Sequence, residues 1–347
     1  MTLLSSGGLF LLISLSVAAV GVVLAWSSDR VGEAFRLERS MTGFVMLAAA
    51  TSLPELIISC QVARAGLPDM AVGSLLGSCL FNLLILALVD MVRRPGGRLL
   101  TISATVHSIP ALSSILLAAI VVLAVLIPGL PSLGVVHSAS LLLLVVYVVT
   151  TRLVFVNQQA HSHAETASID AAESIEPPMV SAQDDKAVAS RFPTWIPIFG
   201  YLAATAAIFL LSRPLASTSE NLAGLLGLSG TFFGAVFLAM VTSLPEVSTT
   251  YESARMGAND LAIGNILGSN TFNLMIIVAV DLVYDGPLFH SLDNVHVIAA
   301  IGVIVTTTVA TMGILFRSDQ KPRWYLEPGA IALSCCSLGF FYLIYLM

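Results

Sequence analysis

Charged residues are scarce in this chain of 347 residues. Lys, Arg, Asp and Glu together make up 10% of the chain, whereas they make up about 25% of an ordinary soluble domain. The mean hydropathy is +0.93, and 57% of the residues are hydrophobic. This composition excludes a soluble globular protein and predicts an integral membrane protein, with room for about ten spans of about 20 residues each.

Cysteines and early basic residues are few as well. The four cysteines all lie in apolar segments without the spacing of a zinc site or a disulfide framework, so we interpret them as small buried residues. They are Cys60, Cys79, Cys335 and Cys336. No Lys or Arg precedes Arg30, so residues 7–26 lack the basic start of a signal peptide and are predicted to form a retained first span.

Apolar stretches bounded by charges, proline and glycine predict ten helices. The expected ranges are 7–26, 41–64, 68–92, 102–126, 134–155, 193–213, 229–253, 259–283, 293–316 and 326–346. The segment 156–192 is rich in acidic residues, Ser and Ala and has little to bury, so we expect an acidic cytoplasmic linker without fixed structure. The predicted organisation is a first five-helix repeat over 1–155, this linker, and a second five-helix repeat over 193–347.

Two stretches of the chain are nearly the same sequence. Residues 43–91 align with residues 234–282 without a gap, at a constant offset of 191, and about half of the 49 aligned positions are identical. Because five spans precede the linker, the second half enters the membrane from the opposite side, so the copies are inverted repeats. The expected fold class is an all-α polytopic membrane protein with ten transmembrane helices in two inverted five-helix repeats.

The basic residues indicate an orientation. If the N-terminus lies outside, 13 of the 15 Lys and Arg residues fall in inside loops, and only Arg64 and Arg213 fall outside. An excess of basic residues in cytoplasmic loops is the usual rule for membrane proteins. We therefore expect a multi-pass protein of the cell (plasma or inner) membrane with both termini extracytoplasmic.

Each repeat has a Pro-Glu pair near the middle of a predicted span, within Thr51-Ser-Leu-Pro-Glu55 and Thr242-Ser-Leu-Pro-Glu246. Pro54 has no N–H to bond the carbonyl of Ala50, so the helix should break here. Backbone freed in this way is tolerated at membrane depth only where it is buried in protein or lines a cavity. The sequence therefore predicts two broken helices that approach from opposite sides of the membrane.

The residues at each break are hard-cation ligands. Thr51 and Ser52 lie four and three positions before Glu55 and can share its face. Carbonyls, hydroxyls and a carboxylate are the oxygen ligands that ions such as Ca²⁺ prefer. The alternative is a capping box, in which Ser52 caps the second half-helix and Glu55 reaches back to it. A cap needs no charge, whereas an ionised acid at mid-membrane costs about 2.5 kcal/mol or more, so we favour the cation site.

A second motif follows in each repeat, with the residues Gly73, Gly77, Ser78 and Asn82 matched by Gly264, Gly268, Ser269 and Asn273. The Ser and the Asn are four positions apart and share a helix face. The alternative is a packing motif, in which the glycines allow close helix approach and the Ser and Asn bond a neighbouring helix. Amide oxygens are also good Ca²⁺ and Na⁺ ligands.

Other polar residues carry weaker signals. Asp90 and Asp281 are repeat-equivalent and lie near a span end, where interfacial solvation or a helix contact is the default and a vestibule site the alternative. His107 and His296 lie near the starts of spans four and nine; interfacial structure is the default and a proton-linked role the alternative.

At these motifs the chain resembles a known family. The paired Gly…Thr-Ser-Leu-Pro-Glu and Gly-Ser-x-x-x-Asn motifs are similar to the two alpha-repeats of the calcium/cation antiporter superfamily, most of all to its prokaryotic sodium/calcium exchanger branch. The proton/calcium branch, which has Gly-Asn-Ala-x-Glu in its first motif, is a poorer match because both copies here read Thr-Ser-Leu-Pro-Glu.

The resemblance implies a site at the membrane midplane between spans 2, 3, 7 and 8. Glu55 and Glu246 would be the central ligands, shared by Ca²⁺ and the counter-ion. The other implied ligands are the hydroxyls of Ser52, Ser243, Ser78 and Ser269, the carbonyls of Ala48, Thr51, Ala239 and Thr242, and the amides of Asn82 and Asn273. Spans 1 and 6 would slide against the other eight to give alternating access.

The chain departs from the family pattern at Asn273, where characterised prokaryotic sodium/calcium exchangers that resemble it carry Asp. The first repeat also reads Gly73-Ser74 and Gly77-Ser78-Cys79, where the family usually has Gly-Asn and Gly-Ser-Asn. Two carboxylates are neutralised by one Ca²⁺, two Na⁺ or two protons. Three Na⁺ would leave a buried positive charge, which is costly.

We therefore expect a secondary active antiporter that exchanges Ca²⁺ for Na⁺ or H⁺. The alternatives of the same fold are a proton-coupled exchanger and one selective for Mn²⁺ or Mg²⁺, because the same ligands suit these ions. A cation channel is disfavoured since no filter sequence is present, and an enzyme is disfavoured since no nucleophile–base pair lies at membrane depth. We expect no cofactor, no nucleic acid and no obligate protein partner; the lipid bilayer and inorganic cations are the expected partners.

Overall fold

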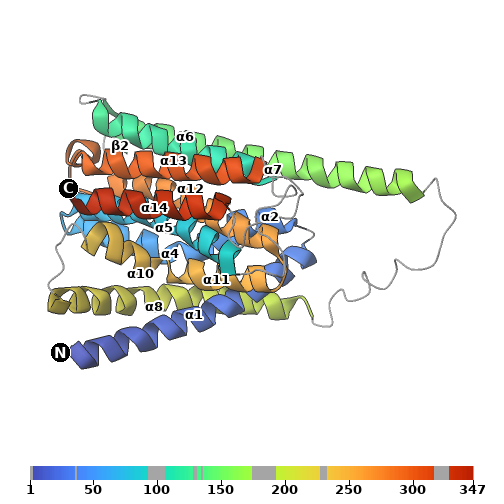
Figure 1. Cartoon of the computed structure of the whole chain (residues 1–347), viewed down its shortest axis with the longest axis horizontal. Helices are drawn as coiled ribbons and strands as arrows, with labels where there is room; N and C mark the ends of the chain where they lie inside the picture. Colours follow the sequence, from blue (N-terminus) through green and yellow to red (C-terminus); the bar gives the residue numbers. More distant parts are fainter. Residues whose placement is uncertain are drawn as a thin grey trace.

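A computed structural model of the chain shows a bundle of long helices with both chain ends at the same end of the bundle (Figure 1). The structure describes residues 3–35, 37–92, 106–127, 131–133, 136–173, 193–226, 233–315 and 328–346. The elements of the first half are α1 (Leu3–Ala34), α2 (Arg39–Met41), the π-helix η1 (Thr42–Leu47), α3 (Ala48–Thr51), α4 (Leu53–Arg64), α5 (Pro68–Val92), α6 (Ser108–Leu126), β1 (Ser132–Leu133), β2 (Val136–His137) and α7 (Ser138–Glu173).

The second half repeats much of this order. Its elements are α8 (Trp195–Leu226), the π-helix η4 (Phe233–Leu238), α10 (Ala239–Thr242), α11 (Leu244–Arg255), α12 (Asn259–Val283), the 3-10 helix η5 (Leu288–His290), α13 (Val295–Leu315) and α14 (Pro328–Leu346). In both halves a π-helix, a single helical turn and a 12-residue helix follow one another before a 25-residue helix. The internal sequence repeat is therefore a structural repeat.

The helices have the length and composition of membrane spans. Within the described residues, eight helices are long and apolar enough to cross a bilayer, and Arg39–Thr51 with Leu53–Arg64 forms one further span bent by 42°. In the second repeat η4, α10 and α11 hold the matching positions. The elements agree with the inverted plan of two sets of five, with the broken span second in each set.

Several helices are longer than the sequence predicts. α1 continues past residue 26 to Ala34, and α8 continues past residue 213 to Leu226, through Pro214. Apolar windows detect the membrane-embedded part of a helix, whereas backbone hydrogen bonding propagates beyond it into the interface. Helix α6 begins at Ser108, later than expected, and residues 102–105 lie outside the described part.

The linker prediction is wrong in its first part. We expected no fixed structure from residue 156, but α7 continues to Glu173. The segment carries Ala, Gln and Glu, which favour helix, and a helix already formed in the membrane extends at little cost because its nucleus exists. Residues 174–192 lie outside the described part of the chain.

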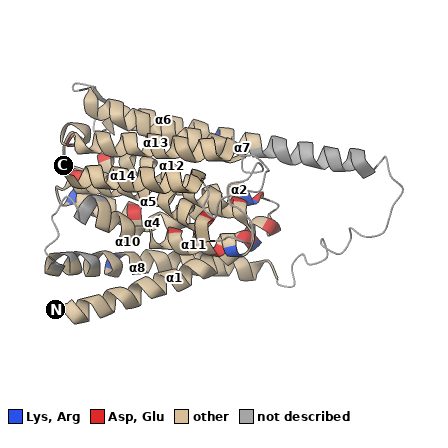
Figure 2. Ribbon diagram, in the orientation of Figure 1, with Lys and Arg blue, Asp and Glu red and all other residues tan. Residues whose placement is uncertain are grey.

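Helices α5 and α12 form the centre of the bundle. They are the most thoroughly buried of the long helices, whereas α1, α7 and α8 expose Leu, Val and Phe side chains as lipid-facing helices do. Charged residues are sparse along the helices and gather near α2 (Figure 2). The core therefore consists of the repeat motifs themselves.

Glycines on α12 bring it against the broken span of the other repeat. A Cβ at Gly264 would lie 2.6 Å from the carbonyl oxygen of Ser40, and a Cβ at Gly268 would overlap the carbonyl oxygen of Phe44. Such contacts require glycine, so they agree with the packing alternative for the second-repeat glycines. The central helix of each repeat therefore packs against the broken span of the other repeat.

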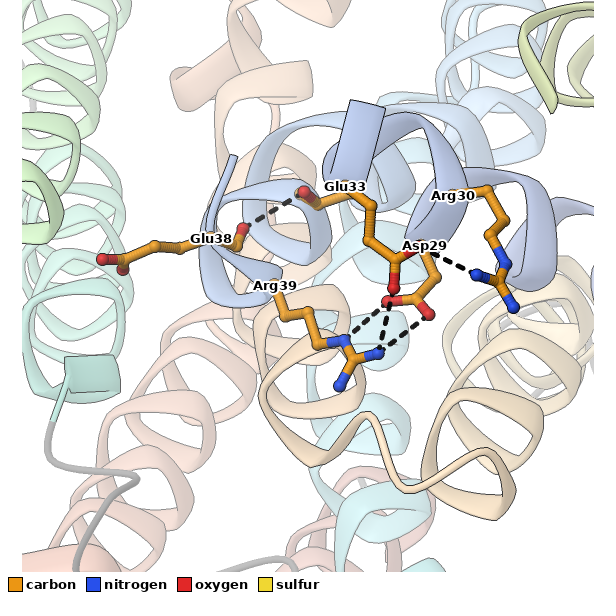
Figure 3. A network of polar contacts seen from close by, with 6 residues as sticks. Asp29, Arg30, Glu33, Glu38 and Arg39 are labelled. Atoms are coloured by element: carbon orange, nitrogen blue, oxygen red, sulfur yellow. Dashed lines mark hydrogen bonds and ion pairs between the residues drawn. The ribbon is translucent and has the colours of Figure 1, made fainter. Parts of the chain in front are cut away.

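Ion pairs join the end of α1 to the start of α2 (Figure 3). The guanidinium of Arg39 contacts both carboxylate oxygens of Asp29, at 2.7 and 3.1 Å, and lies 3.6 Å from Glu33. Glu33 also accepts a hydrogen bond from Arg30 at 3.0 Å. This network fixes α1 to the beginning of the bent span at one end of the bundle.

Candidate functional site

The site begins at the two helix breaks. The first break falls at Ser52, whose backbone (φ −84°, ψ 9°) leaves the helical region, and the second falls at Ser243 with nearly the same angles (φ −84°, ψ 12°). Each proline lies in the first turn of the following half-helix, where its missing N–H is tolerated. The break predicted at Pro54 is therefore observed two residues earlier.

Glu55 lies immediately after the first break and is fully buried. Its Oε1 accepts hydrogen bonds from Ser243 Oγ at 3.1 Å and from Ser78 Oγ at 3.4 Å. Ser243 belongs to the break of the other repeat, and Ser78 belongs to α5. The carboxylate is therefore held at the contact between the two repeats.

Glu246 repeats this arrangement from the opposite direction. Its Oε1 accepts hydrogen bonds from Ser52 Oγ at 3.3 Å and from Ser269 Oγ at 3.4 Å, and the side chain is fully buried. The capping alternative is thus contradicted, because neither Ser52 nor Ser243 caps its own helix. Each serine instead reaches across to the glutamate of the other repeat.

The second carboxylate oxygen of each glutamate accepts no hydrogen bond in the described structure. Among the described atoms, Oε2 of Glu55 and Oε2 of Glu246 have no hydrogen-bond partner although they are buried. A buried carboxylate oxygen without a partner is costly, and a bound cation removes this cost. Each of these two oxygens is therefore chemically suited to bind a cation.

Two asparagines complete the polar centre. Asn82 Nδ2 donates to Asn270 Oδ1 at 3.0 Å, and Asn270 Nδ2 donates to the carbonyl of Cys79 at 3.2 Å. Neither amide atom of Asn273, nor Oδ1 of Asn82, has a hydrogen-bond partner in the described structure. These amides supply further unpaired oxygens, while Asn270, which the sequence analysis missed, orients Asn82.

The threonines and alanines of the motif are also almost fully buried. The carbonyl of Ala48 accepts from Ser52 N at 3.0 Å and from Thr51 Oγ1 at 3.2 Å. The carbonyl of Ala239 accepts from Thr242 Oγ1 at 3.2 Å and lies 3.4 Å from Ser78 Oγ. Both carbonyls still accept hydrogen bonds from residues at the break. They are therefore less available as cation ligands than we expected.

All 12 predicted site residues are buried, and hydrogen bonds link Ser52, Glu55, Ser243 and Glu246 of the two breaks with Ser78 and Ser269. The predicted residues are Ala48, Thr51, Ser52, Glu55, Ser78, Asn82, Ala239, Thr242, Ser243, Glu246, Ser269 and Asn273. Within the described chain, no three His, Cys, Asp or Glu residues form a metal cluster. A cation here would depend on two carboxylates and on neutral oxygens.

The two predicted histidines lie outside this centre and bridge the repeats. His107 Nε2 lies 3.1 Å from Asp260 Oδ1, and His296 Nε2 lies 2.9 Å from Asp69 Oδ1. Asp69 and Asp260 are repeat-equivalent and each begins a central helix. The default expectation of interfacial structure agrees with this geometry, and the aspartates were the partners that sequence analysis missed.

Asp281 has a structural contact that the sequence did not reveal. Its Oδ2 accepts from the backbone N–H of His137 at 2.9 Å, at the start of α7. The ring of His137 packs on Phe289 with centroids 4.9 Å apart, and burial lowers the pKa of His137 below its ordinary value. This contact fits the helix-contact expectation for Asp281.

Comparisons with known proteins agree with this architecture. A profile of the family described as Sodium/calcium exchanger protein matches residues 5–156 and 196–347. The chain is 30% identical over 280 residues to the inner membrane protein YrbG of Escherichia coli, covering 77% of this chain and 79% of that protein. It is 41% identical over 69 residues to sodium/potassium/calcium exchanger 2 of Homo sapiens, covering 20% of this chain and 10% of that protein.

The fold is also found among solved structures. A structure of the sodium-calcium exchanger NCX_Mj, soaked with Na⁺ and Sr²⁺, superposes with a TM-score of 0.67 at 16% sequence identity, covering 98% of this chain and 97% of that one. At this identity the likeness shows the fold alone. The profile, however, covers both repeats and most of the chain. The protein is a membrane antiporter of the calcium/cation antiporter superfamily and belongs to the sodium/calcium exchanger protein family.

Proposed function

We propose that this protein is a secondary active antiporter that exchanges Ca²⁺ for Na⁺ or H⁺ at the site formed by Glu55 and Glu246. The observation that carries the proposal is the interlocked pair of breaks. Each glutamate is held through Oε1 by two serines and keeps a buried Oε2 without a partner. Hard divalent cations prefer oxygen ligands of this kind.

The burial of the site supports alternating access. Both carboxylates are fully buried, and they lie in the first turns of α4 and α11, the half-helices that follow the two breaks. An ion held there must leave by one side at a time, which is the requirement for coupled exchange. We propose that α1 and α8, which pack side by side along one edge of the bundle (Figure 1), move together to open either side.

The charge of the site supports electroneutral coupling. Two glutamates supply two negative charges, and Asn82 and Asn273 are neutral. One Ca²⁺ or two monovalent cations balance this charge, whereas three monovalent cations would leave a positive charge in a low-dielectric interior. We propose that one Ca²⁺ exchanges for two Na⁺ or two H⁺.

Transport by purified protein in proteoliposomes tests this function. Ca²⁺ uptake is expected only when an outward Na⁺ gradient or an outward H⁺ gradient is imposed, and imposing each gradient separately identifies the coupling ion. Glu55→Gln and Glu246→Gln should each lower uptake by about a hundredfold or more, because even outer-shell changes cost up to about a hundredfold in metal affinity.

The matched control is Glu33→Gln, which changes a glutamate with a half-exposed side chain (45%) outside the site. It should leave uptake near the wild-type rate. Uptake that survives both substitutions in the site would place transport elsewhere. Ca²⁺ flux that needs no counter-ion would identify a channel instead.

A further inference from the structure

One face of α11 is polar along its whole buried length. Its residues recur at intervals of three and four, so they lie above one another on the helix. We name this row the α11 stripe; it consists of Glu246, Thr249, Thr250 and Ser253, all fully buried. The repeat-equivalent row on α4 consists of Glu55, Ile58, Ser59 and Val62. The two repeats therefore match at the two glutamates but differ further along the half-helices, where α11 has polar residues and α4 has Ile58 and Val62.

Hydrogen bonds connect the α11 stripe to the centre. Asn265 Nδ2 donates to the hydroxyls of Thr249 and Thr250, both at 3.0 Å. Its Oδ1 lies 3.3 Å from Thr51 Oγ1, and Thr51 Oγ1 lies 3.3 Å from Ser269 Oγ. Since Ser269 donates to the glutamate of α11, oxygen-bearing side chains continue without interruption from the carboxylate to the middle of the stripe.

The equivalent row on α4 has no such chain of hydrogen-bonding side chains. Ser74 is the repeat equivalent of Asn265, and its buried hydroxyl has no partner among the described residues. The hydroxyl of Ser59 is likewise buried without a partner. Ile58 and Val62 occupy the remaining positions, at 3% and 9% exposure. The polar chain therefore leads away from the centre on one side only.

The far end of the stripe lies at the C-terminal end of α11. Ser253 Oγ is buried, and the described structure gives it no partner. The adjacent Glu252 is 9% exposed and pairs with Arg255 at the end of α11. Helix α1 packs beside the stripe: a Cβ at Gly21 would overlap the hydroxyl of Ser248 and lie 3.5 Å from Thr249 Cγ2.

Helix packing alone accounts for only part of this arrangement. Side-chain hydrogen bonds between helices explain Thr249, Thr250 and Asn265. They do not explain why Ile58 and Val62 occupy the equivalent positions of α4, where Thr249 and Ser253 stand on α11. A cation that leaves its hydration shell needs replacement oxygens along its route, whereas an apolar constriction excludes water and ions.

We propose that the α11 stripe lines the cation route between the central site and the membrane face where α11 ends, and that Ile58 and Val62 form an apolar barrier on the opposite side. In the orientation that the basic residues predict, this face is cytoplasmic. The identity of the carried ion rests on the proposed function, but the position of the route does not.

Cysteine accessibility tests the route. In a background with Cys60, Cys79, Cys335 and Cys336 replaced, the matched variants are Ser253→Cys and Val62→Cys, which occupy repeat-equivalent positions. Inverted and right-side-out vesicles are treated with a membrane-impermeant cationic methanethiosulfonate. Ser253→Cys should react from the face where α11 ends about ten times faster than Val62→Cys reacts from the other face, because thiol reactivity follows access to water.

The outcomes separate the route from the transport function. Equal rates at the two positions, or no reaction at Ser253→Cys, would overturn the route even if Ca²⁺ exchange is measured. Reaction at Ser253→Cys without any Ca²⁺ exchange would overturn the function and leave the route standing. If Ser253→Cys is not monodisperse in detergent, Thr250→Cys compared with Ser59→Cys makes the same comparison.

Transport by grafted variants provides a second measurement. The double variant Thr249→Ile with Ser253→Val gives α11 the residue types of Ile58 and Val62 on α4. It should slow Ca²⁺ exchange about tenfold, because the route would become apolar. The converse graft, Ile58→Thr with Val62→Ser, should not slow it. Equal slowing by both grafts would show that these positions matter only for packing.

Discussion

Glu55 and Glu246 each hold one carboxylate oxygen between two serines and leave the other without a protein partner. The sequence predicted both acids and all four serines, because a glutamate beside a proline in mid-membrane is hard to explain structurally. It did not predict that each serine of a break would bond the glutamate of the other repeat. That pairing depends on how the two breaks meet in space.

Asn273 determines the charge of the site. Asn273→Asp would add a third carboxylate to the candidate site, and a further monovalent cation would then be needed to balance it. Wild-type Ca²⁺ exchange is expected to be insensitive to a membrane potential set with valinomycin and K⁺, whereas the variant is expected to respond to it. Asn221→Asp, on an exposed position of α8, should behave as wild type. A wild-type rate that changes severalfold with potential would contradict the charge count.

At the scale of the element, glycine determines how closely α12 approaches the first-repeat break. In Gly268→Ala the added Cβ would overlap the carbonyl oxygen of Phe44 and lie 2.7 Å from Ala48 Cβ. Overpacking of this kind costs about 1–3 kcal/mol, and it would displace the neighbouring Ser269. We expect a lower melting temperature in detergent and reduced Ca²⁺ exchange.

Gly7→Ala is the control, because a Cβ at that position would meet no atom within 4 Å. It should melt at or slightly above the wild-type temperature, since Ala favours helix over Gly. Equal melting temperatures for the two variants would show that α12 is packed less tightly than the structure indicates.

The ion pairs between α1 and α2 are also an element-scale feature. Asp29 is 7% exposed and Arg39 binds both of its oxygens, but the arginine side chain is 46% exposed, so solvent weakens the pair. A double-mutant cycle of Asp29→Asn and Arg39→Gln should give a coupling free energy of about 1 kcal/mol. The coupling should fall when the salt concentration rises. A coupling near zero at low salt would mean that α1 is not fixed at this end.

At the scale of the whole molecule, both chain ends lie at one end of the bundle (Figure 1). The count of basic residues predicts that this end is extracytoplasmic. Alkaline phosphatase fused after residue 346 should therefore be active, and green fluorescent protein at that position should be dark. A fluorescent protein inserted between residues 174 and 192 should be bright. The reverse pattern would invert the orientation and exchange the two faces of the proposed route.

The sequence by itself determined the membrane class, the repeat and the places of the two breaks to within two residues, and it predicted 12 site residues that the structure buries. Composition and period act locally, so they can be read from the chain. Only the tertiary structure decided which helix ends continue beyond the apolar windows, that Asn265 joins Thr51 to α11, and that Asp69 and Asp260 meet the histidines. These contacts join residues more than 150 positions apart or depend on packing geometry, and no local pattern specifies them.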